Sequence, residues 1–270
     1  MRSALRRLAV EVVGRRSLLP ASRRVVLLYH DVSERSAAVH SPDYSTTPAT
    51  FARHLDRFER TVRFTSLDEV VDPATPSADR PLAALTFDDG FRSVLEVAAP
   101  ELRRRGIPFT VFVNGRAVRD GSLDYLAGVQ GPRAGGTRPY LDADELVELS
   151  RSGAVIGSHT TGHRPLAGLD DAELAAEIDA NKAYLESIVD VPVDHLALPY
   201  GKRRHYDERA LARAFAAGHR WVHGTNPTTF TAADAQGFDH RPVPRIGFTE
   251  ETDRELLFLL NRPLVRRLDL

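Results

Sequence analysis

Short apolar runs alternate along the chain with longer segments in which apolar positions repeat about every 3.6 residues. The runs have the length of buried strands and therefore predict strands. They lie at residues 25–30, 82–87, 109–114, 154–159, 195–200, 221–224 and 243–248. The segments between them predict amphipathic helices at 48–62, 93–106, 142–153, 170–189 and 207–218.

Two features interrupt this regular alternation. Pro100 stands inside the segment 93–106 and predicts a kink or a division of that helix, because proline lacks a backbone donor and clashes with the preceding turn. The segment 115–140 is rich in Gly and Arg and is too long for a plain connection. Its length is typical of a functional loop.

Strands and helices in alternation predict an α/β protein in which the strands pair in parallel and the helices lie outside. About seven strands, without a linker-like change of composition, favour a distorted (β/α) barrel. A doubly wound open sheet is the alternative that the pattern leaves open. In this interpretation residues 24–248 form one domain, 1–23 form a basic N-terminal helix or extension, and 249–270 form an amphipathic helix packed on the domain.

The composition narrows the possible partners. The chain has 270 residues, of which 42% are hydrophobic and 27% charged, and this suits one large domain with a substantial core. The formal net charge is -1, so no overall field would attract nucleic acid, and we predict no nucleic-acid partner. The chain has no cysteine, which excludes disulfides and thiolate metal sites.

The ends of the chain bear on its location. In the N-terminal segment the longest apolar run is Leu8–Val10, before Glu11. A secretory signal needs about 7–15 apolar residues, so we identify no signal peptide and expect a cytoplasmic location or one at the cytoplasmic face of the membrane. Either terminal helix could contact a membrane peripherally or simply pack on the domain. No stretch reaches the roughly 20 apolar residues of a transmembrane helix.

Polar residues follow four of the predicted strands at the point where each strand ends. They are His30 with Asp31, Asp88 with Asp89, His159 with His163, and Pro199 with Tyr200 and Gly201. Each group alone has a structural explanation, such as a turn that caps the next helix or a histidine pair bonded to backbone groups. Active sites of parallel barrels gather where the carboxyl ends of the strands meet. The joint occurrence of the four groups therefore predicts one functional site.

Two imidazoles and one carboxylate make a common three-ligand site for a divalent metal, with positions left for water and substrate. His159 and His163 are four residues apart, and either a helix or a strand-to-loop turn can bring both to one ion. One of Asp88 and Asp89 would complete the site. The other would remain beside the metal, placed to take a proton from water. The cation would also relieve the repulsion between the adjacent carboxylates.

Three motifs, in this order, resemble those of the polysaccharide deacetylases, the NodB-homology group of carbohydrate esterases. They are TFDDGF at 86–91, SHTTGH at 158–163 and LALPYG at 196–201. The resemblance spans about residues 24–248, nearly the whole chain. LLYHDV at 27–32 and PRIGF at 244–248 are further similar to the branch that includes the deacetylases of poly-N-acetylglucosamine.

The resemblance implies a role for each motif residue. Asp88 would be the general base. Three residues would bind the metal: Asp89, His159 and His163. The metal would be zinc, with cobalt, nickel or another divalent ion as alternatives. The substrate would contact the turn of Pro199, Tyr200 and Gly201, where the backbone N–H of Tyr200 would face the developing oxyanion.

Two departures from the family pattern concern catalysis. Many members carry an arginine two residues before the proline of the third motif, where it holds the catalytic base, and this chain has Ala197 there. Many also carry a late histidine that protonates the leaving amine, and the segment around Arg245 has none. We hypothesise that Arg245 supplies the missing guanidinium and that His30 is the acid, because in a closed barrel the first strand lies beside the last. The alternative for His30 is a core histidine bonded to the backbone.

The resulting prediction is a metal-dependent hydrolase that removes N-acetyl (or O-acetyl) groups from a carbohydrate and releases acetate. Two alternatives remain open at this point: a hydrolase of another non-peptide C–N bond on the same scaffold, and a carbohydrate-binding relative that has lost catalysis. The substrate class implied is an N-acetylated carbohydrate. His219, His223 and His240 have no partners at a spacing typical of a site, and Trp221 suits the core better than a sugar-stacking position.

Overall fold

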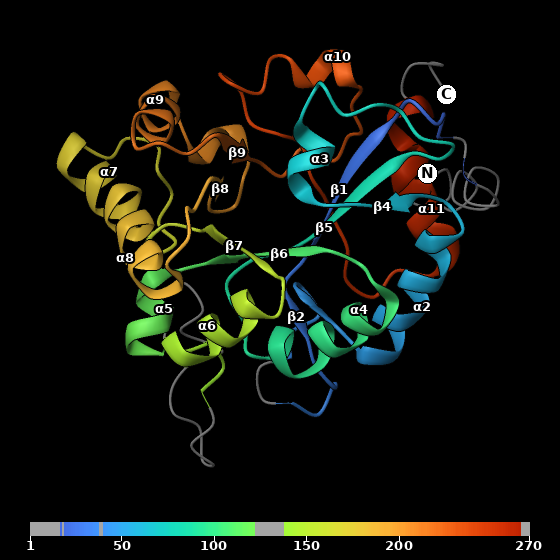
Figure 1. The fold of residues 1–270 in the computed structure, drawn as a ribbon, viewed down its shortest axis with the longest axis horizontal. Coiled ribbons are helices and arrows are strands. Elements are labelled where there is room, and N and C mark those ends of the chain that lie inside the picture. Colours follow the sequence, from blue (N-terminus) through green and yellow to red (C-terminus); the bar gives the residue numbers. More distant parts are fainter. Residues whose placement is uncertain (1–16, 18, 38–39, 122–137, 266–270) are drawn as a thin grey trace, which may run out of the picture.

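The computed structural model describes residues 17, 19–37, 40–121 and 138–265 of the chain. A curved row of parallel strands lies at its centre, with helices around it (Figure 1). In spatial order the row is β10 (Ile246–Gly247), β1 (Arg24–Tyr29), β5 (Leu82–Phe87), β6 (Phe109–Val113), β7 (Val155–Ser158), β8 (His195–Ala197) and β9 (Trp221–His223). Each strand lies within a predicted run or begins one residue before it, so the seven predicted strands are confirmed.

The two ends of this row are joined through Val243, three residues before β10. Val243 forms a parallel bridge with His223 of β9. Its N–H donates to the carbonyl of Val222 at 2.7 Å, and its own carbonyl accepts from the N–H of Gly224 at 2.9 Å. The predicted distorted (β/α) barrel is therefore confirmed, and the open sheet is wrong, since the row of strands returns to its start.

Three short strands lie outside this row. β4 (Arg63–Phe64) pairs in parallel with the first half of β5. β2 (Asp31–Val32) and β3 (Ser45–Thr46) form a separate parallel pair. The sequence pattern did not predict them, because strands of two residues are too short for alternation to be visible.

The α-helices of the described part are α2 (Pro48–Glu59), α3 (Leu67–Val71), α4 (Ala99–Arg105), α5 (Gly115–Asp120), α6 (Ala143–Arg151), α7 (Asp171–Glu177), α8 (Asp179–Val189), α9 (Glu208–Ala216), α10 (Ala232–Ala235) and α11 (Asp253–Val265). Every predicted helix of this part is present, and three short helices, α3, α5 and α10, were not predicted. Several of the α-helices begin with a capping box, in which a polar N-cap and the third helical residue satisfy each other's backbone N–H groups. Asp142 with Glu145 does so at α6, and Asp170 with Glu173 at α7.

Pro100 divides the segment 93–106 as predicted. A π-helical turn covers Val94–Ala98, and α4 begins directly after it with Pro100 in its first turn, where the missing N–H costs nothing. The long loop predicted at 115–140 begins instead with α5, while residues 122–137 lie outside the described part of the chain.

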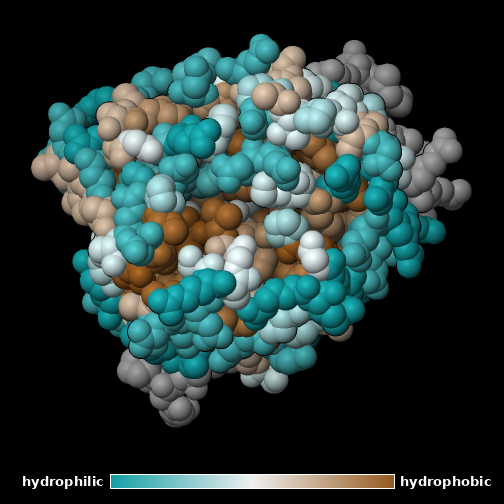
Figure 2. Space-filling model, in the orientation of Figure 1, coloured by the Kyte–Doolittle hydropathy of each residue, from teal (hydrophilic) through white to brown (hydrophobic). Residues whose placement is uncertain are grey.

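Alternate residues of each strand contribute to different apolar clusters. Val25 and Leu27 of β1 belong to the large cluster between the strands and helices, whereas Val26 belongs to a second cluster with Phe112 and Phe230. In the view of Figure 2, polar residues cover the outer helices, and apolar residues gather in a hollow across the middle. This alternation fixes which side chains point inward at the strand ends.

The C-terminal helix α11 packs on the barrel through its leucines. Leu256, Leu257 and Leu260 are fully buried in the large cluster. The predicted N-terminal helix falls almost entirely outside the described residues, and the boundaries at residues 23 and 248 stay a prediction. Among the helices of the described part, none is long and apolar enough to cross a membrane.

Candidate metal centre

Asp88 and Asp89 lie directly after β5, and both side chains are buried. Their side chains are 3% and 4% exposed. Asp89 and Gly90 both adopt left-handed backbone conformations, with φ of 71° and 68°, so the chain turns sharply as it leaves the strand. Aspartate tolerates this region better than most residues. The turn therefore places two adjacent carboxylates in the interior, and the interpretation of Asp88–Asp89 as a solvated helix cap is wrong.

The two histidines reach the same point from the loop that follows β7. The Nδ1–H of His159 donates to the carbonyl of Ala197 in β8 at 2.8 Å, which directs Nε2 toward Asp89. Thr160 and His163 have φ of 66° and 56°, and the N–H of His163 donates to the Thr160 hydroxyl at 3.1 Å. This tight loop brings His163 back beside His159, with ring centroids 4.7 Å apart.

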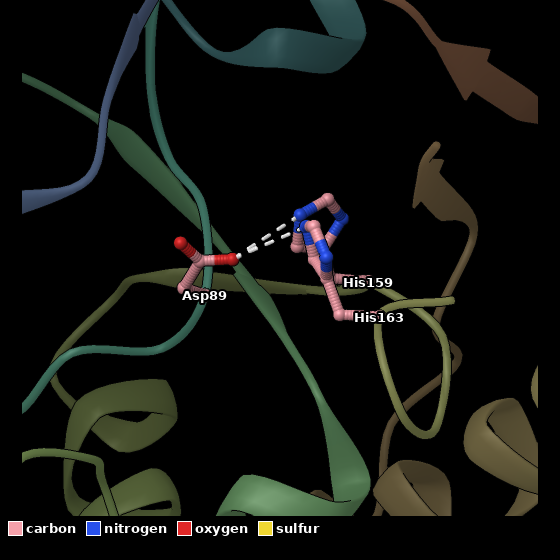
Figure 3. A group of neighbouring side chains, drawn as sticks. All are labelled: Asp89, His159 and His163. Atoms are coloured by element: carbon pink, nitrogen blue, oxygen red, sulfur yellow. Dashed lines mark ion pairs between the residues drawn. The ribbon is translucent and has the colours of Figure 1, made fainter. Parts of the chain in front are cut away.

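Asp89, His159 and His163 form a compact group (Figure 3). Both imidazole rings point toward one oxygen of Asp89, whose Oδ1 lies 3.4 Å from His159 Nε2 and 3.6 Å from His163 Nε2. A tetrahedral zinc ion with bonds of about 2.0–2.1 Å holds its ligand atoms about 3.3–3.5 Å apart. The spacing therefore matches a metal site.

Asp89 Oδ1 is also buried without a hydrogen-bond partner among the described residues. A buried carboxylate oxygen without a donor is unfavourable unless a cation neutralises it. This atom, together with the two nitrogens aimed at it, fits a divalent ion. The structure does not identify the metal, because the same N and O ligands suit zinc, cobalt and nickel.

Asp88 remains outside the ligand group and is held by Arg245. The guanidinium donates to both carboxylate oxygens, at 2.7 Å each, and its Nε–H donates to the carbonyl of Gly224 at 3.1 Å. Arg245 is fully buried, with its guanidinium 5.1 Å from the centre of the Phe112 ring. The hypothesised replacement of the missing arginine thus has a geometric basis: Arg245 reaches Asp88 from the position directly before β10, whereas Ala197 cannot.

The charges of the site keep both aspartates ionised. Burial raises the pKa of Asp88, but the attraction of Arg245 and His159 outweighs it, so the pKa lies below its usual range. For Asp89, burial is likewise outweighed by the attraction of His159 and His163, and its pKa is lowered. Burial and the neighbouring His159 lower the pKa of His163 to about 3. A neutral imidazole at His163 has a lone pair for a metal.

A cavity of about 470 Å³ opens in front of these residues. His30 lies in its wall at the end of β1, half-buried, and its ring is 6.5 Å from that of Tyr44. Asp31, the neighbour of His30 in the predicted polar group, is not in the wall and instead accepts hydrogen bonds from Ser33 and Ser93. The structure therefore brings His30 to the site and leaves Asp31 in a structural role.

The third motif contributes one residue to the cavity wall. Tyr200 lines it and is 38% exposed, whereas Pro199 and Gly201 are buried in the turn behind it. The turn is held by Thr225, whose N–H donates to the carbonyl of Gly201 and whose hydroxyl donates to that of Tyr200. Pro199 and Gly201 therefore position Tyr200, and a direct contact of these two residues with the substrate stays a prediction.

Other residues of the cavity wall carried no signal in the sequence. They include Asp43, Tyr44, Lys202, Thr225, Phe248, Thr249 and Glu251. Asp43 and Tyr44 lie between β2 and β3, and the other residues lie in irregular segments after β8, β9 and β10. In such segments neither period nor spacing indicates which side chains face the site.

Comparison with known proteins relates the whole arrangement to one family. A family profile described as polysaccharide deacetylase matches residues 75–222, more than half of the chain. YxkH of Bacillus subtilis, whose name assigns it to the polysaccharide deacetylases, is 24% identical over 143 residues, which cover 53% of this chain and 44% of YxkH. The chain thus spans less than half of the length of this curated relative.

Two solved structures share the fold over most of the chain. The deacetylase PplD of Streptococcus pyogenes, solved in complex with acetate, superposes with a TM-score of 0.69 at 20% identity and covers 87% of this chain and 96% of its own. IcaB of Ammonifex degensii superposes with a TM-score of 0.67 at 23% identity and covers 88% of this chain and 97% of its own.

Proposed function

Because this chain belongs to the polysaccharide deacetylase family, we propose that it is a metal-dependent hydrolase that removes N-acetyl groups from a carbohydrate and releases acetate. O-acetyl groups are a second class of bond that the same chemistry can cleave. The observation that carries the proposal is the pairing of two functions in adjacent residues: Asp89 points at two histidines, and Asp88 is clamped by Arg245 at the edge of the same cavity.

Asp89, His159 and His163 would hold the ion. When bound, a divalent ion supplies Lewis acidity toward water and the acetyl carbonyl oxygen. The acid–base chemistry is left to the protein. Asp88 accepts the proton of the attacking water, and its two hydrogen bonds from Arg245 keep it ionised and fix its orientation.

Two further groups act on the acetyl group and the leaving amine. The backbone N–H of Tyr200 stabilises the developing oxyanion, at a turn that Thr225 holds in place. His30, also in the cavity wall, donates a proton to the leaving nitrogen. The half-buried position of His30 on this wall supports the role of a proton donor over that of a core histidine.

The test is acetate release from N-acetylglucosamine oligomers by the purified protein, with Asp88→Asn as the inactive control. Asp88→Asn should lower kcat about 100- to 10,000-fold, because a general base contributes that much, while the bound metal per chain is unchanged. Asp89→Asn should instead lose the metal. Chelation should abolish activity, and zinc, cobalt or nickel should restore it, with the rank order identifying the preferred ion.

The outcome also separates the two alternatives. Release of a product other than acetate from a formylated or cyclic amide substrate would indicate hydrolysis of another C–N bond. A protein that binds no divalent metal and shows no turnover would be a carbohydrate-binding relative. The third motif lacks the usual arginine, and this absence is a reason to consider a loss of catalysis. Arg245 supplies the guanidinium instead, and its bidentate contact with Asp88 argues against that loss.

A further inference from the structure

A second hollow adjoins the proposed active site. Its volume is about 390 Å³, and it is lined by Arg116, Thr161, Gly162, His163, Arg164, Pro165, Glu177 and Tyr200. Two of these residues, His163 and Tyr200, also line the metal cavity. The two hollows therefore share a wall, and a ligand that crosses Tyr200 reaches both.

Tyr200 is suited to this position between the two hollows. It is one of two large apolar side chains that are exposed in the described part of the chain. Its ring lies edge-on to that of His163 and tilted against that of His205, with centroids 4.8 Å from each. Aromatic rings in such exposed positions stack on sugars and other flat apolar faces.

The second hollow has a basic wall. Arg116 comes from α5 and Arg164 from the metal-binding loop, and the two segments are tied where the N–H of Arg116 donates to the carbonyl of Thr161 at 3.0 Å. Glu177 is the one carboxylate in the wall, and it accepts the N–H of Gly162 at 2.8 Å. Two guanidiniums and one partly satisfied carboxylate thus face this hollow.

Each of the two arginines forms an ion pair at the protein surface. Arg116 lies 3.7 Å from Asp120, and Arg164 lies 2.9 Å from Glu173, with all four side chains well exposed to solvent. Neither Asp120 nor Glu173 lines the hollow. Exposed pairs of this kind contribute little, so an anion that enters the hollow can replace them at small cost. Guanidinium groups bind carboxylates and phosphates in a forked geometry that a lysine does not offer.

Resting on the function proposed above, we propose that this hollow binds an anionic group, a carboxylate or a phosphate, on the substrate beside the acetylated sugar. The acetylated residue occupies the metal cavity, and the next unit passes over Tyr200 so that its anion lies between Arg116 and Arg164. The enzyme thereby prefers acidic glycans to neutral ones.

The test compares three N-acetylglucosamine substrates of similar size: a neutral chitobiose, a disaccharide with glucuronate, and a sugar with a phosphate. The wild-type kcat/KM should be about 10-fold or more higher for at least one acidic substrate, as expected for a charge-assisted pair. The substrate that shows the preference distinguishes carboxylate from phosphate. In Arg116→Gln/Arg164→Gln the ratio of acidic to neutral kcat/KM should fall to near one.

The matched control is Arg103→Gln/Arg209→Gln, which removes the same charge from residues outside both cavities and should keep the wild-type ratio. Equal kcat/KM for neutral and acidic substrates in the wild type, or a preference that survives in the Arg116/Arg164 variant, would overturn the inference while leaving deacetylation intact. If the wild type releases no acetate from any of them, the proposed function fails. Calorimetric binding of the acidic sugars to Asp88→Asn then tests the hollow independently.

Discussion

At the scale of single residues, the site divides into parts that the sequence could predict and parts that it could not. Asp88, Asp89, His159 and His163 lie in short motifs at strand ends, so their convergence follows from the parallel topology alone. The contact between Arg245 and Asp88 is different. It joins residues 157 positions apart, so no local pattern predicts it. It could only be hypothesised, because Ala197 stands where many family members carry the arginine that holds the catalytic base.

A second cluster of side chains shows more clearly which contacts could not be predicted from the sequence. His195 Nδ1 lies 3.0 Å from His223 Nε2, and its Nε2 lies 3.2 Å from Asp68. His223 packs against Phe112, on which Arg245 also rests. These groups come from α3, β8 and β9, and no spacing in the sequence connects them. His223 therefore had no recognisable partner before the structure placed it in this chain of contacts.

The first prediction concerns Arg245. In Arg245→Met, Asp88 loses both donors and stays buried without a partner, so we expect kcat to fall about 100-fold or more with the metal content unchanged. Arg245→Lys keeps the charge without the forked contact and should retain an intermediate rate. Steady-state kinetics with metal analysis is the measurement. A kcat for Arg245→Met within about twofold of wild type would mean that Asp88 acts as a base without the two hydrogen bonds from Arg245.

The second prediction concerns His30. His30→Ala should lower kcat about 100-fold for an N-acetylated substrate, because the leaving amine then lacks a proton donor, and should leave the bound metal unchanged. A substrate with a good leaving group, such as an aryl acetate ester, needs no such proton and should be affected less. If both substrates lose the same factor, or if neither does, His30 is not the acid.

At the scale of elements, the metal-binding loop is held by a helix that the sequence predicted as continuous. The predicted helix at 170–189 is broken at Ile178, which ends α7 and begins α8. The N–H and hydroxyl of Thr161, within the loop, donate to the carbonyls of Glu177 and Ala176 next to the break. Groups inserted at a helix in this way are a common cause of kinks. Because the apolar periodicity continues across Ile178, this break could not be predicted from the sequence.

Asn181, on α8, connects this helix to the ends of two strands. Its amide NH₂ donates to the carbonyl of Val113 at 3.0 Å and to the Ser158 hydroxyl at 2.8 Å. Its carbonyl accepts the N–H of Gly115 at 2.7 Å. The residue is 1% exposed, so every one of these bonds lies in the interior. One side chain thus fixes the exits of β6 and β7, from which the metal loop departs.

The third prediction follows from these bonds. Asn181→Leu keeps the branched shape of the side chain but leaves the buried N–H of Gly115 without a partner and the carbonyl of Val113 with one donor instead of two, and should lower the free energy of unfolding by about 1–3 kcal/mol. Because the loop between Ser158 and His163 loses its anchor, metal affinity should also fall about 10-fold, although no ligand has changed. Urea unfolding and competition with a metal chelator measure the two effects. Lower stability with unaltered metal affinity would show that the loop is held by other contacts.

At the scale of the whole molecule, the sequence predicted the number and order of the strands but could not decide whether they close. Closure depends on Val243, an isolated bridge residue between β9 and β10, and β10 itself has two residues. Such short pairings leave no periodic pattern. The pairing of β10 with β1, the first strand of the chain, decides function, since it brings Arg245 to Asp88 and sets His30 and Phe248 in one cavity wall.

The stability of the whole chain should depend on pH through a histidine remote from the site. His219 is buried, and its Nδ1 lies 3.0 Å from the carbonyl of Val193. Burial, together with the charge of Lys182, lowers the pKa of His219 from 6.5 to about 4. A proton that binds the unfolded chain but not the folded one favours unfolding. The contribution of His219 to stability is therefore complete above the unfolded pKa and declines as the pH falls from 6.5 toward 4.

The fourth prediction is that His219→Gln reduces this pH dependence. Glutamine can still donate to the carbonyl of Val193 but does not titrate, so the variant should lose about 2 kcal/mol less unfolding free energy than wild type between about pH 7 and pH 5. Urea titrations of both proteins at each pH give the difference, in which every other titrating group cancels. An unchanging difference across this range would mean that His219 is protonated equally in both states. The acid sensitivity of the fold would then have to come from other buried histidines, of which His54 and His223 also have lowered pKa values.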